Sequence, residues 1–138
     1  MRNTFRDKTK DGRVSVREGT FADTGEESGW ADALFIAQAF HWAHPNYDAT
    51  MKEIARVLKP EASAFLVWNL EDRDRAAWVA SIRDLYEAYE NKTPQFRLNL
   101  WEAAFITPSY LSNFHPPERF STEWIVDTSV EGVRDRVM

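Results

Sequence analysis

Two side chains that could do chemistry, His41 and Trp42, follow directly after a nearly continuous apolar run in this chain. The unperturbed pKa of an imidazole lies near neutrality, so His41 could take a proton from a hydroxyl or carboxyl group. Trp42 stands beside His41, immediately past the end of the apolar run, where it could face a small substrate. The alternative for His41 is structural, with a ring that only orients a turn.

The apolar run itself extends from Ala33 to Phe40 and is interrupted at Gln38. Such a run predicts a strand that is covered on both faces of a parallel sheet. Ligands in open α/β sheets bind beyond the carboxyl ends of the strands, which makes Ala37 and Gln38 candidate binding residues. A buried amide needs hydrogen-bond partners, and a purely structural bond explains Gln38 equally well.

A helix and a second strand follow His41 and Trp42. Tyr47, Met51, Ile54 and Leu58 recur at i, i+4, i+7 and i+11, which places them on one helix face against a sheet. Pro60 is expected to end the helix, and the residues from 64 to 69 read as the next strand. The predicted fold class is therefore α/β.

The rest of the chain predicts shorter elements. In order, they are a strand at 13–17, a polar loop at 19–30, an amphipathic helix at 75–89, a short helix at 98–105, a strand at 119–126 and a last helix that opens at a capping box, Thr128 to Glu131. We expect one partial domain over residues 1–138, with a frayed, solvated terminus at 1–12.

Three segments in this order carry a family resemblance: ADALFIAQAFHW at 31–42, RVLKP at 56–60 and FLVWN at 65–69. The succession resembles the second half of the class I S-adenosylmethionine-dependent methyltransferases, in particular the small-molecule, type 11-like branch. The resemblance covers residues 14–70 well and 71–134 loosely. It implies a Rossmann-like sheet that is incomplete, because only the later strands of the family are present.

The resemblance also implies a cofactor, a reaction and roles for residues. S-adenosylmethionine would lie with its adenine near Thr20 and Phe21 and with its methionine part near Ala37 and Gln38. His41 would then be catalytic, and Trp42 would contact a small-molecule acceptor that is methylated on a carboxylate or a hydroxyl. A carboxylate needs no base, so positioning would do most of the catalysis. The alternative for Thr20 and Phe21 is an ordinary loop with a buried phenylalanine.

The chain departs from the family pattern in its glycines. Its five glycines include no G-x-G pair, although the family begins with a Gly-rich cofactor loop, and Glu61-Ala62 stands where the family has Gly-Gly. Two hypotheses remain open. The chain is a truncated methyltransferase, or it is an inactive remnant that forms a homodimer or binds a partner chain through the sheet edge left unpaired.

Composition excludes several function classes. A net charge of −5 gives no electrostatic reason to bind nucleic acid. The chain has no cysteine for disulfides or thiolate chemistry and no apolar run long enough to span a membrane, so we expect a cytoplasmic protein. His44 and His115 lack the spacing of a metal site, and we predict no metal.

Overall fold

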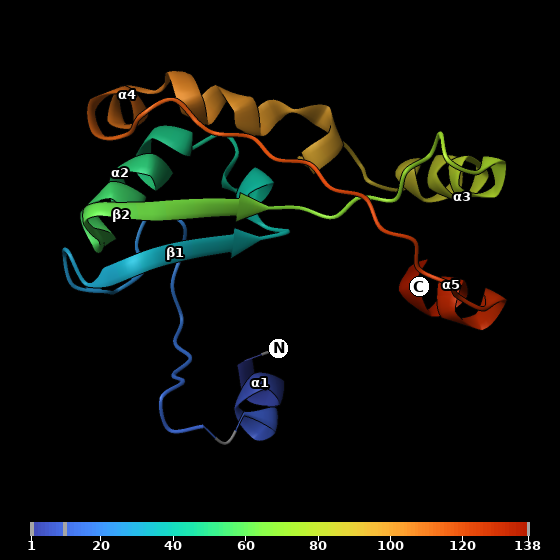
Figure 1. Ribbon diagram of the computed structural model, residues 1–138, viewed down its shortest axis with the longest axis horizontal. Coiled ribbons are helices and arrows are strands. Elements are labelled where there is room, and N and C mark those ends of the chain that lie inside the picture. Colours follow the sequence, from blue (N-terminus) through green and yellow to red (C-terminus); the bar gives the residue numbers. More distant parts are fainter. Residues whose placement is uncertain (1, 10, 138) are drawn as a thin grey trace. The chain divides into compact units, whose positions relative to one another are not determined.

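The computed structural model describes residues 2–9 and 11–137, and the chain divides into two compact units (Figure 1). Unit 1 comprises Met1–Trp68 and Gln95–His115, and unit 2 comprises Asn69–Pro94 and Pro116–Met138. The elements are α1 (Arg2–Lys8), β1 (Ala31–Ala37), η1 (Phe40–Ala43), α2 (Tyr47–Val57), β2 (Leu58–Val67), α3 (Ala77–Glu87), η2 (Phe96–Leu98), η3 (Leu100–Ile106), α4 (Pro108–Asn113) and α5 (Val130–Val137), where η denotes a 3₁₀ helix.

Unit 1 is built around a β1–α2–β2 motif. The two strands pair in parallel, with Phe35 opposite Phe65, and form a two-stranded sheet. Helix α2 connects them, and η3 and α4 pack against α2 (Figure 1). This mixed arrangement confirms the predicted α/β class and is consistent with a partial Rossmann-like methyltransferase fold.

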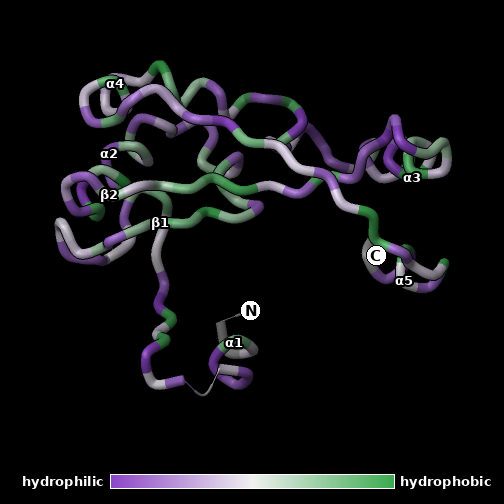
Figure 2. Tube along the Cα trace, viewed as in Figure 1, coloured by the Kyte–Doolittle hydropathy of each residue, from purple (hydrophilic) through white to green (hydrophobic). Residues whose placement is uncertain are grey.

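The expectation that the first strand is covered on both faces is wrong. Leu34 and Ile36 pack against the core, whereas the alternate residue Phe35 is 68% exposed. Side chains alternate between the faces of a strand, so the helices of unit 1 cover one face only. Both strands are nevertheless apolar along most of their length (Figure 2).

The core of unit 1 lies between the sheet and the helices. Tyr47, Met51 and Ile54 are buried on α2, as their helical spacing predicted. Aromatic rings continue the core from the strand ends into η3 and α4. Their members are Phe40, Tyr47, Trp68, Phe96, Trp101, Phe105, Tyr110 and Phe114.

Three local predictions are corrected. Residues 13–17 and 119–126 form no strand, because β-type alternation yields a strand only where a neighbouring strand accepts its hydrogen bonds. Residues 2–8 form α1 rather than a frayed end, and Met1 and Lys10 lie outside the described residues. The predicted helix at 98–105 is the 3₁₀ segment η3.

Unit 2 contains α3 and α5, both at predicted places. The apolar stripe of α3 does not form a core, since Trp78, Leu85 and Tyr89 are exposed. Its buried residue is Arg83, which donates to Glu87 at 2.7 Å. The Ser129 hydroxyl accepts the Gly132 N–H at 3.1 Å, so the cap of α5 lies one residue later than the predicted capping box.

The turn from α2 into β2 is strained at Glu61. Helix α2 ends at Val57 rather than at Pro60, and β2 begins at once with Leu58. Between the first paired residues and Ser63 the register shifts, and Glu61 takes a left-handed φ of 65°. A side chain disfavours this backbone region, as the missing glycine of the family pattern indicated.

We expect Glu61→Gly to raise the free energy of unfolding by up to about 1 kcal/mol, because glycine adopts a positive φ without a Cβ clash. Urea unfolding followed by circular dichroism measures the change. The neighbouring Ala62→Gly is the control. Ala62 is not among the positive-φ residues, so glycine there should destabilise the chain. If both variants changed the free energy of unfolding in the same direction, the strain at Glu61 would be contradicted.

Candidate functional site

His41 lies immediately beyond the carboxyl end of β1, in η1. The residue is buried, and its Nδ1 accepts a hydrogen bond from the Trp68 indole Nε1–H at 3.1 Å. Its carbonyl oxygen accepts the Tyr47 hydroxyl at 3.3 Å. Burial lowers the pKa of His41, because an apolar environment disfavours the charged imidazolium.

The hydrogen bond from Trp68 assigns the tautomer of His41. A neutral imidazole whose Nδ1 accepts carries its proton on Nε2. A second proton could join the ring only at Nδ1, after the bond from Trp68 is broken. The local arrangement therefore favours His41 as a hydrogen-bond donor through Nε2–H over His41 as a general base.

Trp42 is the exposed neighbour of His41. Its ring centroid lies 5.4 Å from that of His41, with the ring planes tilted by 42°, and its side chain is 49% exposed. The two predicted acceptor-side residues thus lie together at the carboxyl end of β1, with an aromatic surface open to solvent. A small organic molecule could stack there.

Ala37 and Gln38 form the strand end itself. The Gln38 N–H donates to the Val67 carbonyl at 2.8 Å, which extends the strand pairing by one residue. Gln38 has a left-handed φ of 54°, so the chain turns away from the strand axis immediately after Ala37. Because Ala37 is exposed and has no side chain beyond Cβ, the strand end is sterically open.

Thr20 and Phe21 lie in a tight turn before β1. The Thr20 N–H donates to the Asp23 carbonyl at 2.7 Å, and the Thr20 hydroxyl accepts the Asp23 N–H at 3.0 Å. Phe21 is half-buried and packs against the core of unit 1. The turn therefore uses the polar groups of Thr20 for its own hydrogen bonds.

These positions would fit only one side of the S-adenosylmethionine site that the family resemblance implies. The exposed Ala37 would leave room for the methionine part, whereas Thr20 and the backbone N–H of Gln38 already have intramolecular partners. Two shallow hollows in the structure lie elsewhere, one beside α1 and one beside α5. Among residues 2–9 and 11–137, no three His, Asp or Glu side chains come together in a way that could hold a metal ion.

Sequence reasoning missed Trp68 as the partner of His41. Trp68 follows the last residue of β2, and its ring stacks on Phe96 and Trp101 with centroid distances of 4.7 Å. The available signal was a tryptophan at the end of an apolar strand, since an indole N–H that is partly buried usually finds an acceptor. The spacing to His41 carried no such information, because the two lie 27 residues apart.

A second missed cluster joins Glu53 and Arg56 of α2 to the loop that precedes β1. The Glu53 carboxylate accepts from the Thr24 N–H and hydroxyl, both at 2.7 Å, and from Arg56 Nε at 2.7 Å. Arg56 Nη2 also donates to the Glu26 carbonyl at 2.7 Å. These bonds fasten the loop to the helix.

The cluster holds Glu53 in its charged form although the residue is buried. The bond from Arg56, followed by those from Thr24, outweighs burial and lowers the pKa of Glu53 to about 2. Because the strand that leads to His41 begins directly after this loop, the cluster helps to fix where β1 starts. We assign it a structural role.

The comparisons with known proteins agree with this architecture. Residues 1–66 match the family model described as a methyltransferase domain. An uncharacterized methyltransferase-like protein of Schizosaccharomyces pombe is 36% identical over 92 residues, which are 67% of this chain and 35% of that protein. A second uncharacterized methyltransferase of the same yeast is 36% identical over 104 residues, 75% of this chain and 39% of that protein.

A bacterial relative is equally similar over a shorter stretch. An uncharacterized methyltransferase of Mycobacterium tuberculosis is 36% identical over 67 residues, 49% of this chain and 26% of that protein. The chain thus spans well under half the length of these relatives. No solved structure matches it significantly.

No helix within the described part of the chain is long and apolar enough to cross a membrane. The family match covers β1, η1, α2 and nearly all of β2, which are the elements that hold His41 and Trp42. These similarities, with a family match over residues 1–66 of 138, support a protein like the class I S-adenosylmethionine-dependent methyltransferases.

Proposed function

We propose that this chain takes part in S-adenosylmethionine-dependent methyl transfer to the carboxylate or hydroxyl of a small molecule. The observation that carries the proposal is the pairing of the neutral His41 with the exposed Trp42 at the end of β1. A donor beside an aromatic surface suits a small acceptor with an oxygen nucleophile. The cytosol is the compartment that we propose, because the chain has no cysteine for disulfides.

The residues of this chain would act by orienting the acceptor. The Nε2–H of His41 would donate to one oxygen of a carboxylate, and Trp42 would hold the carbon skeleton in place. The other carboxylate oxygen would remain free as the nucleophile. The bound cofactor would supply the methyl group of its sulfonium. No base is required for a carboxylate, so a histidine with an occupied Nδ1 is adequate.

Isothermal titration of the purified chain with S-adenosylmethionine and with S-adenosylhomocysteine tests the cofactor part of the proposal. We expect saturable but weak binding, with a Kd on the order of 100 µM, because the fit covers only one side of the cofactor. Ala37→Trp should abolish binding by filling the open strand end. Trp42→Ala should leave binding unchanged, since Trp42 belongs to the acceptor side.

Absence of binding by the folded wild-type chain would contradict the proposal. It would favour a second candidate function, that of a catalytically inactive, partner-binding half-domain. The specific observation behind this second candidate is the sheet of two strands, in which β1 has a paired neighbour on one side only within the described part of the chain.

A further inference from the structure

The two free edges of the sheet in unit 1 differ in how they are protected. In β2, Pro60 lacks an N–H and Glu61 distorts the strand with its positive φ, both near the amino-terminal end. Proline, charge and local distortion are the features with which sheet proteins prevent unwanted pairing of an edge. β1 contains no proline or glycine and has one charged residue, Asp32, at its amino-terminal end.

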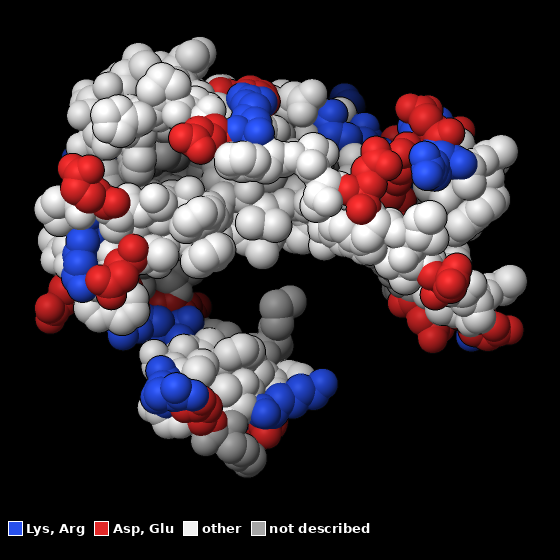
Figure 3. Space-filling model, viewed as in Figure 1, with Lys and Arg blue, Asp and Glu red and all other residues white. Residues whose placement is uncertain are grey.

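The charges of both strands lie at one end of the sheet. Asp32 forms an ion pair with Lys59 at 2.6 Å, and Glu61 is close in sequence. Acidic and basic side chains gather at the left of the view, where both strands begin (Figure 3). From Ala33 to the end of β1 no charged side chain interrupts the edge. The net charge of −5 makes two copies repel at long range, but this edge is locally free of that repulsion.

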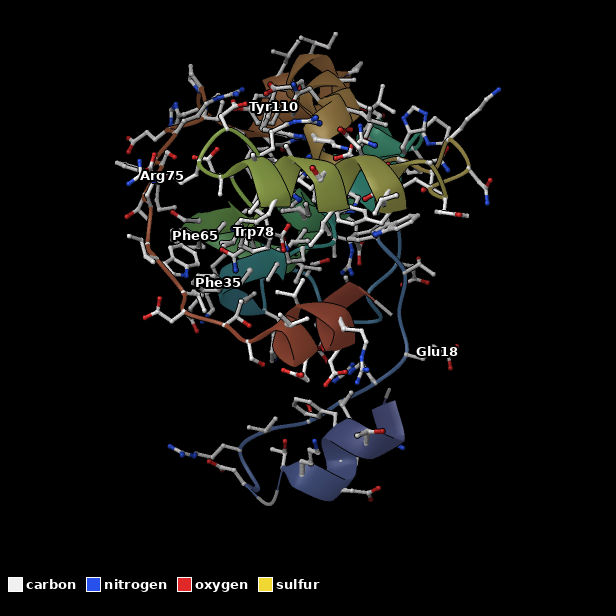
Figure 4. All side chains as sticks on the ribbon, turned by 90° about the vertical axis from the view of Figure 1, so that its right-hand side faces the viewer. Glu18, Phe35, Phe65, Arg75, Trp78 and Tyr110 are labelled. Atoms are coloured by element: carbon white, nitrogen blue, oxygen red, sulfur yellow. The ribbon has the colours of Figure 1, made fainter. Side chains whose placement is uncertain are left out.

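The exposed face beside this edge carries a stacked aromatic pair. The rings of Phe35 and Phe65 have centroids 4.6 Å apart with planes at 12°, and the two side chains lie side by side on adjacent strands (Figure 4). Phe65 is 44% exposed and Val67 45% exposed on the same face. Stacked rings in an exposed position leave apolar surface that a further ring could cover.

The sequence of β1 is self-complementary when read in the opposite direction around Phe35. In an antiparallel pair centred there, Phe35 faces Phe35, Leu34 faces Ile36 and Ala33 faces Ala37. Each position thus meets a residue of its own kind and size on the same face of the sheet. The two Asp32 carboxylates lie at opposite ends, whereas a parallel arrangement would set them side by side.

We propose that a second copy of this chain pairs with the free edge of β1, antiparallel and centred on Phe35, to give a two-fold symmetric four-stranded sheet. The backbone groups at this edge would gain ladder hydrogen bonds, and the Phe65–Phe35 stack would continue into its counterpart across the axis. The outer strands of the assembly are the two β2 strands, which carry Pro60 and the left-handed Glu61 near their amino-terminal ends. This inference is independent of the proposed methyl transfer.

Sedimentation velocity of variants with a charged residue at position 35, which lies on the proposed two-fold axis, tests the proposal. We expect the wild-type chain to sediment as a discrete dimer. Phe35→Lys and Phe35→Glu should each sediment as monomers, because position 35 faces itself and like charges oppose each other. An equimolar mixture of the two variants should recover the dimer, since lysine then faces glutamate.

Ile106→Lys and Ile106→Glu are the matched controls, because Ile106 is 76% exposed on η3, away from the strand edge. Both should remain dimeric, and circular dichroism checks that every variant keeps its fold. A monomeric wild-type chain would overturn the proposal and leave a different protein as the strand donor. Dimeric Phe35 variants, a mixture of the two variants that stays monomeric, or open-ended aggregation of the wild-type chain would also overturn the proposal.

Discussion

Replacing Trp68 with alanine is expected to cost about 3 kcal/mol of the free energy of unfolding, the lower end of the range for removing a large core ring, because Trp68 is half-buried. Trp68 stacks on Phe96 and Trp101 and donates to His41, so its loss breaks the link between the end of β2 and residues 96–101. Urea unfolding followed by circular dichroism measures the effect. A cost below about 1 kcal/mol would show that these rings do not act as a common core.

Trp68→Phe separates packing from hydrogen bonding. A phenyl ring retains most of the stacking but has no N–H, so we expect a cost of only about 1 kcal/mol. The pKa of His41 should stay below its ordinary value in this variant, because a phenyl ring preserves the burial that lowers it. Titration of the His41 ring by NMR provides this readout. A pKa that returns to the ordinary value in Trp68→Phe would contradict burial as its cause and show that the indole hydrogen bond keeps the ring neutral.

The second large effect is expected for Glu53→Gln, at about 2 kcal/mol of lost stability near neutral pH. The pKa of Glu53 is about 2 in the folded chain, against an ordinary value of 4.5. A lowered carboxylate pKa stabilises the folded state above the ordinary pKa, and this contribution disappears as the pH falls from about 4.5 toward 2. The full shift corresponds to roughly 3 kcal/mol, which solvent reduces because Arg56 is 36% exposed.

Urea unfolding at several pH values measures this contribution as a difference between the two proteins. The stability gap between wild type and Glu53→Gln should be largest near pH 6 and should narrow as the pH approaches 3. Glu27→Gln is the control in the same loop, where the side chain is exposed, and it should match the wild type throughout. A gap that does not depend on pH would place the effect in packing rather than in the charge of Glu53.

The sequence predicted the elements whose signals are local. The apolar run at 33–40 and the helical spacing of Tyr47, Met51 and Ile54 identified β1 and α2, with the strand found two residues earlier than expected. The missing glycine at position 61 indicated a strained turn, and the backbone is left-handed there. Each of these features depends on a few neighbouring residues, so one sequence contains enough information.

Features that depend on distant partners could not be predicted in the same way. The alternation at 13–17 and 119–126 had the period of a strand, but a strand forms only where another supplies its hydrogen bonds. The bond from Trp68 to His41 joins residues far apart in the chain, and it changes the chemistry expected of His41. The i, i+3 spacing of Glu53 and Arg56 on α2 was visible, but its contact with Thr24 was not.

The order in which unit 1 assembles follows from where its contacts lie along the chain. The β1–α2–β2 motif and the bonds of Glu53 to the loop before β1 join residues about thirty positions apart. The contact of α4 with α2 joins residues 61 positions apart, as in the bond from the Ser109 N–H to Asp48 at 2.8 Å. Closing longer loops costs more entropy and slows folding. We therefore expect the sheet and α2 to form early in folding, and the aromatic residues of η3 and α4 to pack against them last.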